Sequence, residues 1–174
     1  ATLPAHPGAP IPYLDMTSAG TDGNELTDYD IVGSNEEGTG LFALDRAGRV
    51  DLVCVPSSPT RDHGTTALLA AERWCRSRGA LLIWDPPWSW YTSEGAVLGM
   101  RTLGLKSRYA MTYFPRLRPR GQLARFPAGM PGCGALAGLL ASSDDERGYP
   151  GAPSGSLKSS LTTLVELDEL EAAL

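Results

Sequence analysis

The residues best placed to do chemistry in this 174-residue chain are an aspartate followed by aromatic side chains and a group of three arginines. The first set is the string Asp85-Pro86-Pro87-Trp88-Ser89-Trp90-Tyr91. A carboxylate beside aromatic rings could bind a sugar or a base, but the two prolines equally favour a fixed loop whose tryptophans are buried. The second set is Arg116, Arg118 and Arg120. These arginines could clamp a phosphate, although no Gly-rich loop or helix N-terminus is evident beside them.

A histidine lies in a second candidate string, Asp62-His63-Gly64-Thr65-Thr66-Ala67. This string resembles the His-Gly-Thr segment that carries the general base of subtilisin-type serine proteases. That chemistry also needs a serine nucleophile and an orienting carboxylate. No Gly-Thr-Ser-Met-Ala-like segment follows, and Pro153-Ser154-Gly155-Ser156 lacks the apolar helix start that holds such a serine. We therefore expect His63 to be a loop residue and Thr65 or Asp62 to cap the helix that follows.

A glycine pattern and the cysteines complete the candidate chemistry. The string Gly132-Cys133-Gly134-Ala135-Leu136-Ala137 matches a GxGxxA dinucleotide-binding pattern, but no strand precedes it. Its glycines are predicted instead to allow close packing of a short helix. Two histidines and three cysteines without CxxC spacing argue against a transition-metal site and against a disulfide framework, which favours a reducing compartment. We predict no catalytic, cofactor-binding or metal-binding residues.

The elements that position these residues follow from the apolar pattern. Buried strands are predicted at 50–55, 80–84 and 109–114, each ended by proline or Asp-Pro. Helices are predicted at 65–78, about 93–104 and 133–141. The first has Gly79 as its C-cap and an outward face of Glu72, Arg73, Arg76 and Arg78. Residues 40–44 are expected to form a short helix or turn, and 116–131 a loop. Strands alternating with helices predict an α/β fold with a mainly parallel sheet flanked by helices.

In such a sheet, binding sites lie at the carboxyl ends of the strands. The loops there are 56–64, 85–92 and 114–121. An enzyme must therefore use these loops, and the alternative function is an α/β hydrolase or a small-ligand-binding enzyme with its site at 56–64 and 85–92.

The length predicts one α/β domain over residues 1–174. Its core is expected at about 40–145, after a loop-rich entry segment at 1–39 and before a helical segment at 157–174. The 20 glycines and 14 prolines predict long loops between short elements. No apolar stretch is long enough to cross a membrane, and no export signal is visible.

Charge is distributed unevenly along the chain. The net charge of −5 argues against a general nucleic-acid binder. Residues 1–45 carry eight acidic side chains and no Lys or Arg, whereas 101–125 carry seven basic side chains and no acid. These two segments could pair within one molecule or between neighbours, or could simply be solvated faces of opposite sign.

Several strings, taken in order, resemble the contractile tail sheath proteins of bacteriophages and related injection systems. They are Gly20-Thr21-Asp22-Gly23, Gly40-Leu41-Phe42-Ala43-Leu44 with the strand at 50–56, Ala70-Ala71-Glu72-Arg73-Trp74-Cys75, Trp84 to Pro87, Tyr109-Ala110-Met111-Thr112-Tyr113-Phe114-Pro115, and a late block with Pro131-Gly132, Ala137-Gly138, Asp144 or Asp145, Arg147-Gly148 and Ala152-Pro153. Two features depart from the family pattern: Tyr149-Pro150 replaces Trp-Lys after Arg-Gly, and the chain is shorter than a sheath subunit.

The resemblance implies the central subtilisin-like α/β domain of a sheath subunit, without the protease's catalytic residues, as a fragment of a larger protein. Such a subunit polymerises helically with other copies around an inner tail tube, joins a baseplate, and contracts to drive the tube into a target cell. The resemblance also implies a virion tail location after synthesis in the bacterial cytoplasm, with no enzyme activity, cofactor, nucleic acid or membrane involved. Helical assembly needs two different patches on each copy, and the acidic and basic segments are the candidates.

Overall fold

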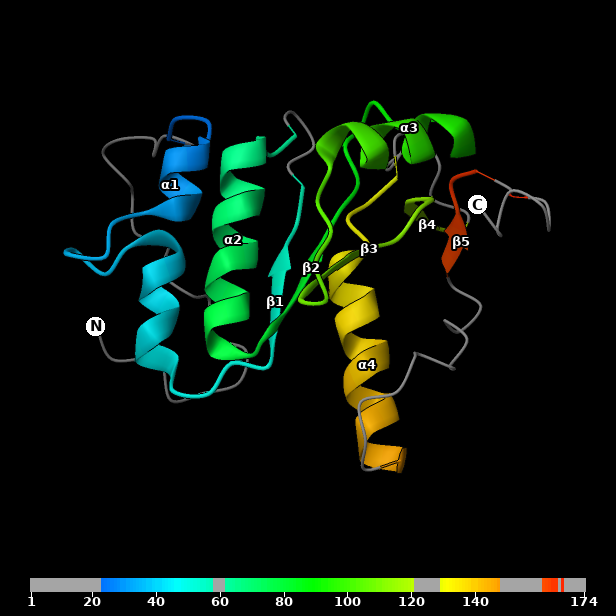
Figure 1. The fold of residues 1–174 in the computed structure, drawn as a ribbon. Helices are drawn as coiled ribbons and strands as arrows, with labels where there is room; N and C mark the ends of the chain where they lie inside the picture. Colours follow the sequence, from blue (N-terminus) through cyan, green and yellow to red (C-terminus); the bar gives the residue numbers. More distant parts are fainter. Residues whose placement is uncertain (1–22, 58–61, 121–128, 148–160, 166, 168–174) are drawn as a thin grey trace, which may run out of the picture.

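The computed structural model describes residues 23–57, 62–120, 129–147, 161–165 and 167 (Figure 1). The helices and strands in this part of the chain are, in order, α1 (Asp28–Val32), the 3-10 helix η1 (Gly40–Ala47), β1 (Leu52–Val55), α2 (Thr65–Arg78), β2 (Leu81–Trp84), α3 (Ser93–Leu103), β3 (Ala110–Thr112), β4 (Leu117–Pro119), α4 (Cys133–Arg147) and β5 (Leu161–Thr163). None of the helices described has the length and hydropathy to span a membrane.

The central sheet consists of three parallel strands in the order β1-β2-β3. Leu52 is in register with Leu81, and Leu82 with Ala110. The order and direction confirm the predicted α/β class with a parallel sheet. Strands β1 and β2 are short apolar runs, as expected where helices cover both faces of a parallel sheet, whereas the edge strand β3 is half-buried and ends in Thr112.

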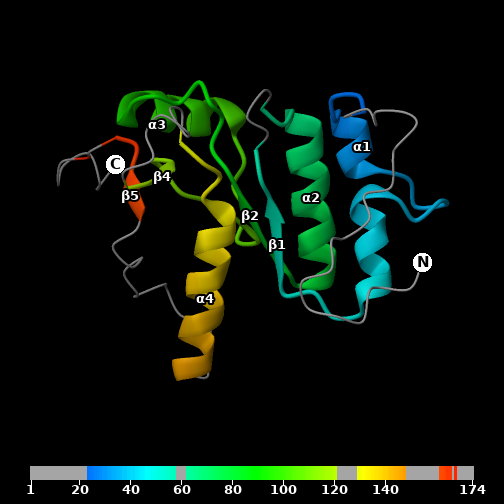
Figure 2. The same cartoon turned by 180° about the vertical axis from the view of Figure 1, so that it is seen from behind.

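Helices α2 and α4 lie on opposite sides of the sheet, as Figures 1 and 2 show from opposite directions. Successive residues of a strand point to opposite faces, and β2 illustrates this alternation. Leu82 is fully buried in the cluster on the α2 side with Cys75. Ile83 is fully buried in the second cluster with Cys133 and Leu140 of α4. The sheet is therefore the middle layer of the core.

Helix α2 has the predicted bounds, but its N-terminus differs from the prediction. Gly79 ends the helix with φ 70° in the left-handed region, as expected. Neither Thr65 nor Asp62 caps the start. The N-cap residue is Gly64, and the Asp28 carboxylate of α1 accepts hydrogen bonds from the backbone N–H groups of Gly64 (2.8 Å) and Ala67 (3.1 Å). A residue 36 positions upstream thus provides the cap, which local sequence could not indicate.

The outward face predicted for α2 is wrong at Glu72. This residue is 5% exposed, and its Oε1 accepts a hydrogen bond of 2.6 Å from Ser107 Oγ. Arg76 lies 3.8 Å from the other carboxylate oxygen. The partner that makes burial of the carboxylate tolerable lies in the segment before β3, beyond the reach of helix periodicity.

Two further expectations are corrected by a second, antiparallel sheet of β4 and β5. The region 116–131 was expected to be a loop, yet it contains β4. The segment 157–174 was expected to be helical, yet it contains β5; only residues 161–165 and 167 of it are described. Long-range pairing of Leu117 with Thr163 overrides the local preferences that suggested a loop and a helix. Helix α1 also lies within the segment 1–39 that was expected to be loop-rich, of which residues 1–22 lie outside the described part.

Helix α3 lies across the end of the sheet at which β1 and β2 finish (Figure 1). The Thr92 side chain caps its start by accepting from the Gly95 N–H at 3.1 Å. Gly99 of this helix faces Trp90, because a Cβ at this position would lie 2.3 Å from the indole ring. This helix and the loops after the strands together enclose the carboxyl edge of the sheet.

Candidate functional site

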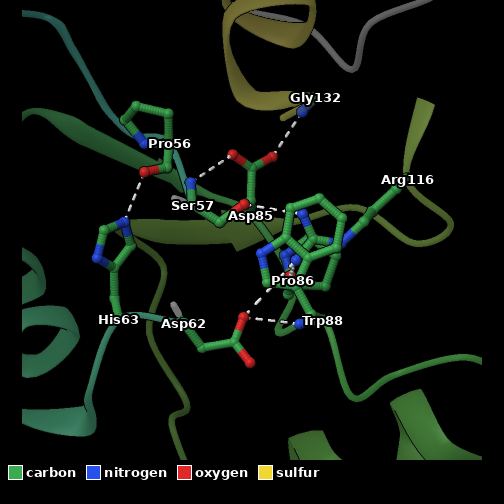
Figure 3. Close-up of polar contacts among 9 residues, drawn as sticks. All are labelled: Pro56, Ser57, Asp62, His63, Asp85, Pro86, Trp88, Arg116 and Gly132. Atoms are coloured by element: carbon green, nitrogen blue, oxygen red, sulfur yellow. Dashed lines mark hydrogen bonds and ion pairs between the residues drawn. The ribbon is translucent and has the colours of Figure 1, made fainter. Parts of the chain in front are cut away.

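Arg116 joins the three loops that follow the parallel strands (Figure 3). Its side chain is 4% exposed. Nη1 donates to Ser57 Oγ at 2.8 Å, and Nη2 donates to the carbonyl oxygen of Pro86. Nη2 also lies 3.8 Å from Asp62 Oδ1, and the guanidinium stacks 3.6 Å from the ring centroid of Trp88. One buried cation therefore holds the loops 56–64, 85–92 and 114–121 together.

Asp85 joins the same edge of the sheet to helix α4. Its Oδ2 accepts from the Ser57 N–H at 3.2 Å, and its Oδ1 accepts from the N–H groups of Gly132 (2.6 Å) and Cys133 (3.0 Å). A carboxylate at this place satisfies backbone donors that the helix cannot pair itself and complements the helix dipole. Asp85 is 6% exposed, so these three bonds replace its hydration.

The Asp85 contacts decide two of the sequence hypotheses. A dinucleotide-binding helix presents its N-terminal N–H groups to a pyrophosphate, but in α4 the Asp85 carboxylate already binds those of Gly132 and Cys133. The packing explanation for the glycines is also wrong at Gly134, where an added Cβ would meet no atom within 4 Å. The geometry gives the GxGxxA string no phosphate-binding role.

The three arginines do not form one clamp, because Arg116 points into the protein. Burial lowers the pKa of the Arg116 guanidinium, and the carboxylates of Asp85 and Asp62 oppose that shift. Arg118 is half-buried in β4, whereas Arg120 is exposed. The two terminal nitrogens of Arg116 are engaged by Ser57, the Pro86 carbonyl and Asp62, which leaves no free pair of donors to clamp a phosphate.

His63 lies in the loop before α2, as predicted, and its ring contacts the backbone. Its Nε2 is 2.6 Å from the carbonyl oxygen of Pro56. A carbonyl only accepts, so Nε2 carries the proton in this contact. The nearby Ser57 hydroxyl accepts from Arg116. These contacts differ from the serine–histidine hydrogen bond that activates a nucleophile.

A pocket of about 500 Å³ opens at the same edge of the sheet, between the strand ends, α2 and α3. The predicted loops 56–64 and 85–92 contribute Ser57, His63, Asp85 and Trp90 to its lining. Helix α3 contributes a whole wall that the sequence analysis did not anticipate. Its signal was present in Gly95 and Gly99, two glycines one turn apart inside a helix, because each is costly there unless something packs closely against it.

The cysteines differ in exposure. Cys75 and Cys133 are buried, and Cys54 is exposed. Burial raises the pKa of the Cys75 thiol to about 11. Burial also raises the pKa of the Cys133 thiol, and the Asp85 carboxylate adds to that shift. Among the residues described, no group of three His, Cys, Asp or Glu side chains is arranged to hold a metal ion.

We expect an aromatic disulfide reagent at pH 8 to label Cys54 at least about tenfold faster than the other two thiols, because only thiolates that solvent reaches react. Cys75 and Cys133 should react only after unfolding in urea. Stopped-flow absorbance with peptide mapping measures the order. Cys54→Ser should remove the fast phase, and a fast phase that accounts for two thiols would contradict the burial of Cys75 or of Cys133, whichever the peptide map identifies.

Comparison of the chain with protein families, with curated proteins and with solved structures gives no match.

Proposed function

We propose that this chain is the α/β domain of a contractile tail sheath subunit, a structural protein that polymerises helically around an inner tube and contracts. The observation that carries the proposal is the ordered series of sheath-like strings on η1, β1, α2, β2 and β3 of one parallel α/β unit. The string at 20–23 and the end of the late block lie largely outside the described residues. The string at 40–44 forms the first part of η1, and the string at 50–56 contains β1. The string at 84–87 starts at the last residue of β2, and the string at 109–115 contains β3. The string at 70–75 places Ala71, Trp74 and Cys75 in the core beneath the sheet.

The contacts at the carboxyl edge of the sheet support a structural role. Arg116 and Asp85 bond to loops and to a helix start, and so fix elements relative to one another. A subunit that transmits force through a helical lattice needs such rigid connections between its elements. No side chain of this network is set up as a nucleophile beside a base.

Some side chains of the two charged segments make contacts within the molecule, so fewer of them are available for the proposed contacts between copies. In the acidic segment, Asp28 caps α2, and Asp45 accepts from Trp74 Nε1 (3.0 Å) and pairs with Arg78 (2.7 Å). The other acidic side chains of this segment in the described part, Glu25, Asp30, Glu36 and Glu37, are exposed, and Asp30 accepts hydrogen bonds from Thr27 at the start of α1. In the basic segment Arg116 is internal, and the exposed members among the described residues are Arg101, Lys106, Arg108 and Arg120.

Electron microscopy of the complete gene product tests the proposal. Tubes or rings of regular diameter are expected, and monodisperse single copies at all protein and salt concentrations would contradict it.

For the charged contact, Arg120→Glu should weaken assembly several-fold at low salt and less at high salt, because ions screen exposed charges beyond ~10 Å at 0.1 M. Arg73→Glu on the exposed face of α2 is the matched control and should assemble normally. Equal assembly of the two variants would contradict the role of Arg120.

A further inference from the structure

The pocket at the carboxyl edge of the sheet has the character of a small-molecule site. Its inner walls are apolar and come from Val55, Leu68, Trp84 and Trp90. Its polar groups include His63 and Thr65 at the start of α2, Asp85 after β2 and Thr102 of α3. Ligand sites in proteins typically enclose about 300–1,000 Å³ with apolar walls and a few polar groups, and about 500 Å³ falls within that range.

The aromatic wall of the pocket is fixed before any ligand binds. Trp84 is buried, and its ring meets that of Trp90 edge to face at 5.9 Å with an interplanar angle of 73°. The absence of a side chain at Gly99 lets the Trp90 indole lie against α3. A preformed surface loses little conformational entropy when a flat molecule stacks on it.

The charges around the pocket select the sign of a ligand. Two carboxylates, Asp62 and Asp85, are among the described lining residues, and no Lys or Arg is. The buried Arg116 interacts with both carboxylates and balances one of their two negative charges, so this edge of the pocket keeps a net negative charge. Gly64 and Thr65 bring the start of α2 to the pocket, where the helix dipole would attract an anion. However, the Asp28 carboxylate already binds the N–H groups of Gly64 and Ala67. The pocket therefore disfavours anions.

We propose that this pocket binds a small planar aromatic molecule that is neutral or carries one positive charge. The ring lies against Trp84 and Trp90, and a hydrogen-bonding or cationic group points to the rim that carries Asp62 and His63. Aromatic faces attract cations as well as rings, so both kinds of contact act in the same direction. This site is independent of the assembly role proposed above.

A pair of probes with the same rings and opposite charges tests the site on the whole chain. Calorimetry and saturation-transfer NMR with 2-naphthylmethylamine should detect saturable binding at least about tenfold tighter than with 2-naphthoate. Binding of the two probes with equal affinity, or of the naphthoate more tightly, would overturn the charge assignment. No saturable binding of the amine would overturn the proposal.

Two variants locate the binding. Leu98 is 67% exposed on α3 and lines the pocket, so Leu98→Trp should fill the mouth and abolish binding. Leu69→Trp is the matched control, because Leu69 is 46% exposed on α2 and is not among the lining residues. Thr102→Lys adds a cation at the rim, so it should weaken binding of the amine and strengthen binding of the naphthoate. Unchanged binding in both Leu98→Trp and Thr102→Lys would overturn the assignment to this pocket.

Discussion

Replacing Arg116 with methionine should lower the free energy of unfolding by about 3 kcal/mol. The reason is that removal of this buried cation leaves its partners on three loops without the group that they contact. The Ser57 hydroxyl and the Pro86 carbonyl lose their charged donor, and Trp88 loses the guanidinium stacked on its ring. Methionine keeps much of the side-chain volume, so the loss reports the polar contacts rather than a cavity. Urea denaturation followed by tryptophan fluorescence measures it.

Arg118→Met is the matched control for that experiment, because Arg118 lies two residues away and is only half-buried. Its cost should stay below about 1 kcal/mol. Arg116→Lys should fall between the two, since lysine keeps the charge but cannot donate to two partners while stacking flat on an indole. An Arg116→Met protein as stable as the wild type would show that the loops are held by other contacts.

The elements that the sequence predicted well are those whose signals are local. Helix α2 combines an apolar stripe with Gly79 as its C-cap, and both its bounds were predicted. Strands β1 and β2 are short apolar runs cut off by Pro56 and by Asp85-Pro86, so their places along the chain were also clear. Parallel order followed because a helix separates each strand from the next.

The elements that the sequence did not predict depend on contacts between distant residues. Pairing of Leu117 with Thr163 makes β4 and β5, although each segment alone suggested something else. Asp28 caps a helix that begins 37 residues further along (65 − 28), a distance at which no capping pattern operates. Burial of Glu72 likewise depends on Ser107.

At the candidate site, the important residues could be identified from the sequence, but the contacts that they make could not. Asp85 and Arg116, the two residues at the centre of the network, are among the candidate residues that the sequence indicates. Their residue types were compatible with contacts to a sugar, a base or a phosphate and equally with a fixed loop, and no binding residue was predicted. The structure directs both inward, because each finds backbone or side-chain partners on loops that only the fold brings together. Spacing along the chain identifies which residues can form strong polar contacts, and the topology decides with what.

Asp85→Ala is the second change with a large expected effect, again about 3 kcal/mol in the free energy of unfolding. Three buried backbone N–H groups, of Ser57, Gly132 and Cys133, lose their acceptor at once. The start of α4 also loses the charge that complements its dipole. Amide hydrogen exchange should therefore accelerate at Cys133 and in the first turn of α4 before it does so in α2.

Two further variants separate the carboxylate's hydrogen bonds from its charge. Asp85→Asn keeps one acceptor oxygen, so it should lower the free energy of unfolding less than Asp85→Ala. The remaining oxygen can accept either from Ser57 or from Gly132 and Cys133, but not from both sides. Asp85→Ala combined with Arg116→Met should cost less than the sum of the single changes, because the aspartate's charge stabilises the buried guanidinium. Strict additivity, measured by urea denaturation of all four proteins, would mean that the two residues act on separate parts of the fold. Coupling of 1 kcal/mol or so would identify them as one buried network linking the sheet to α4.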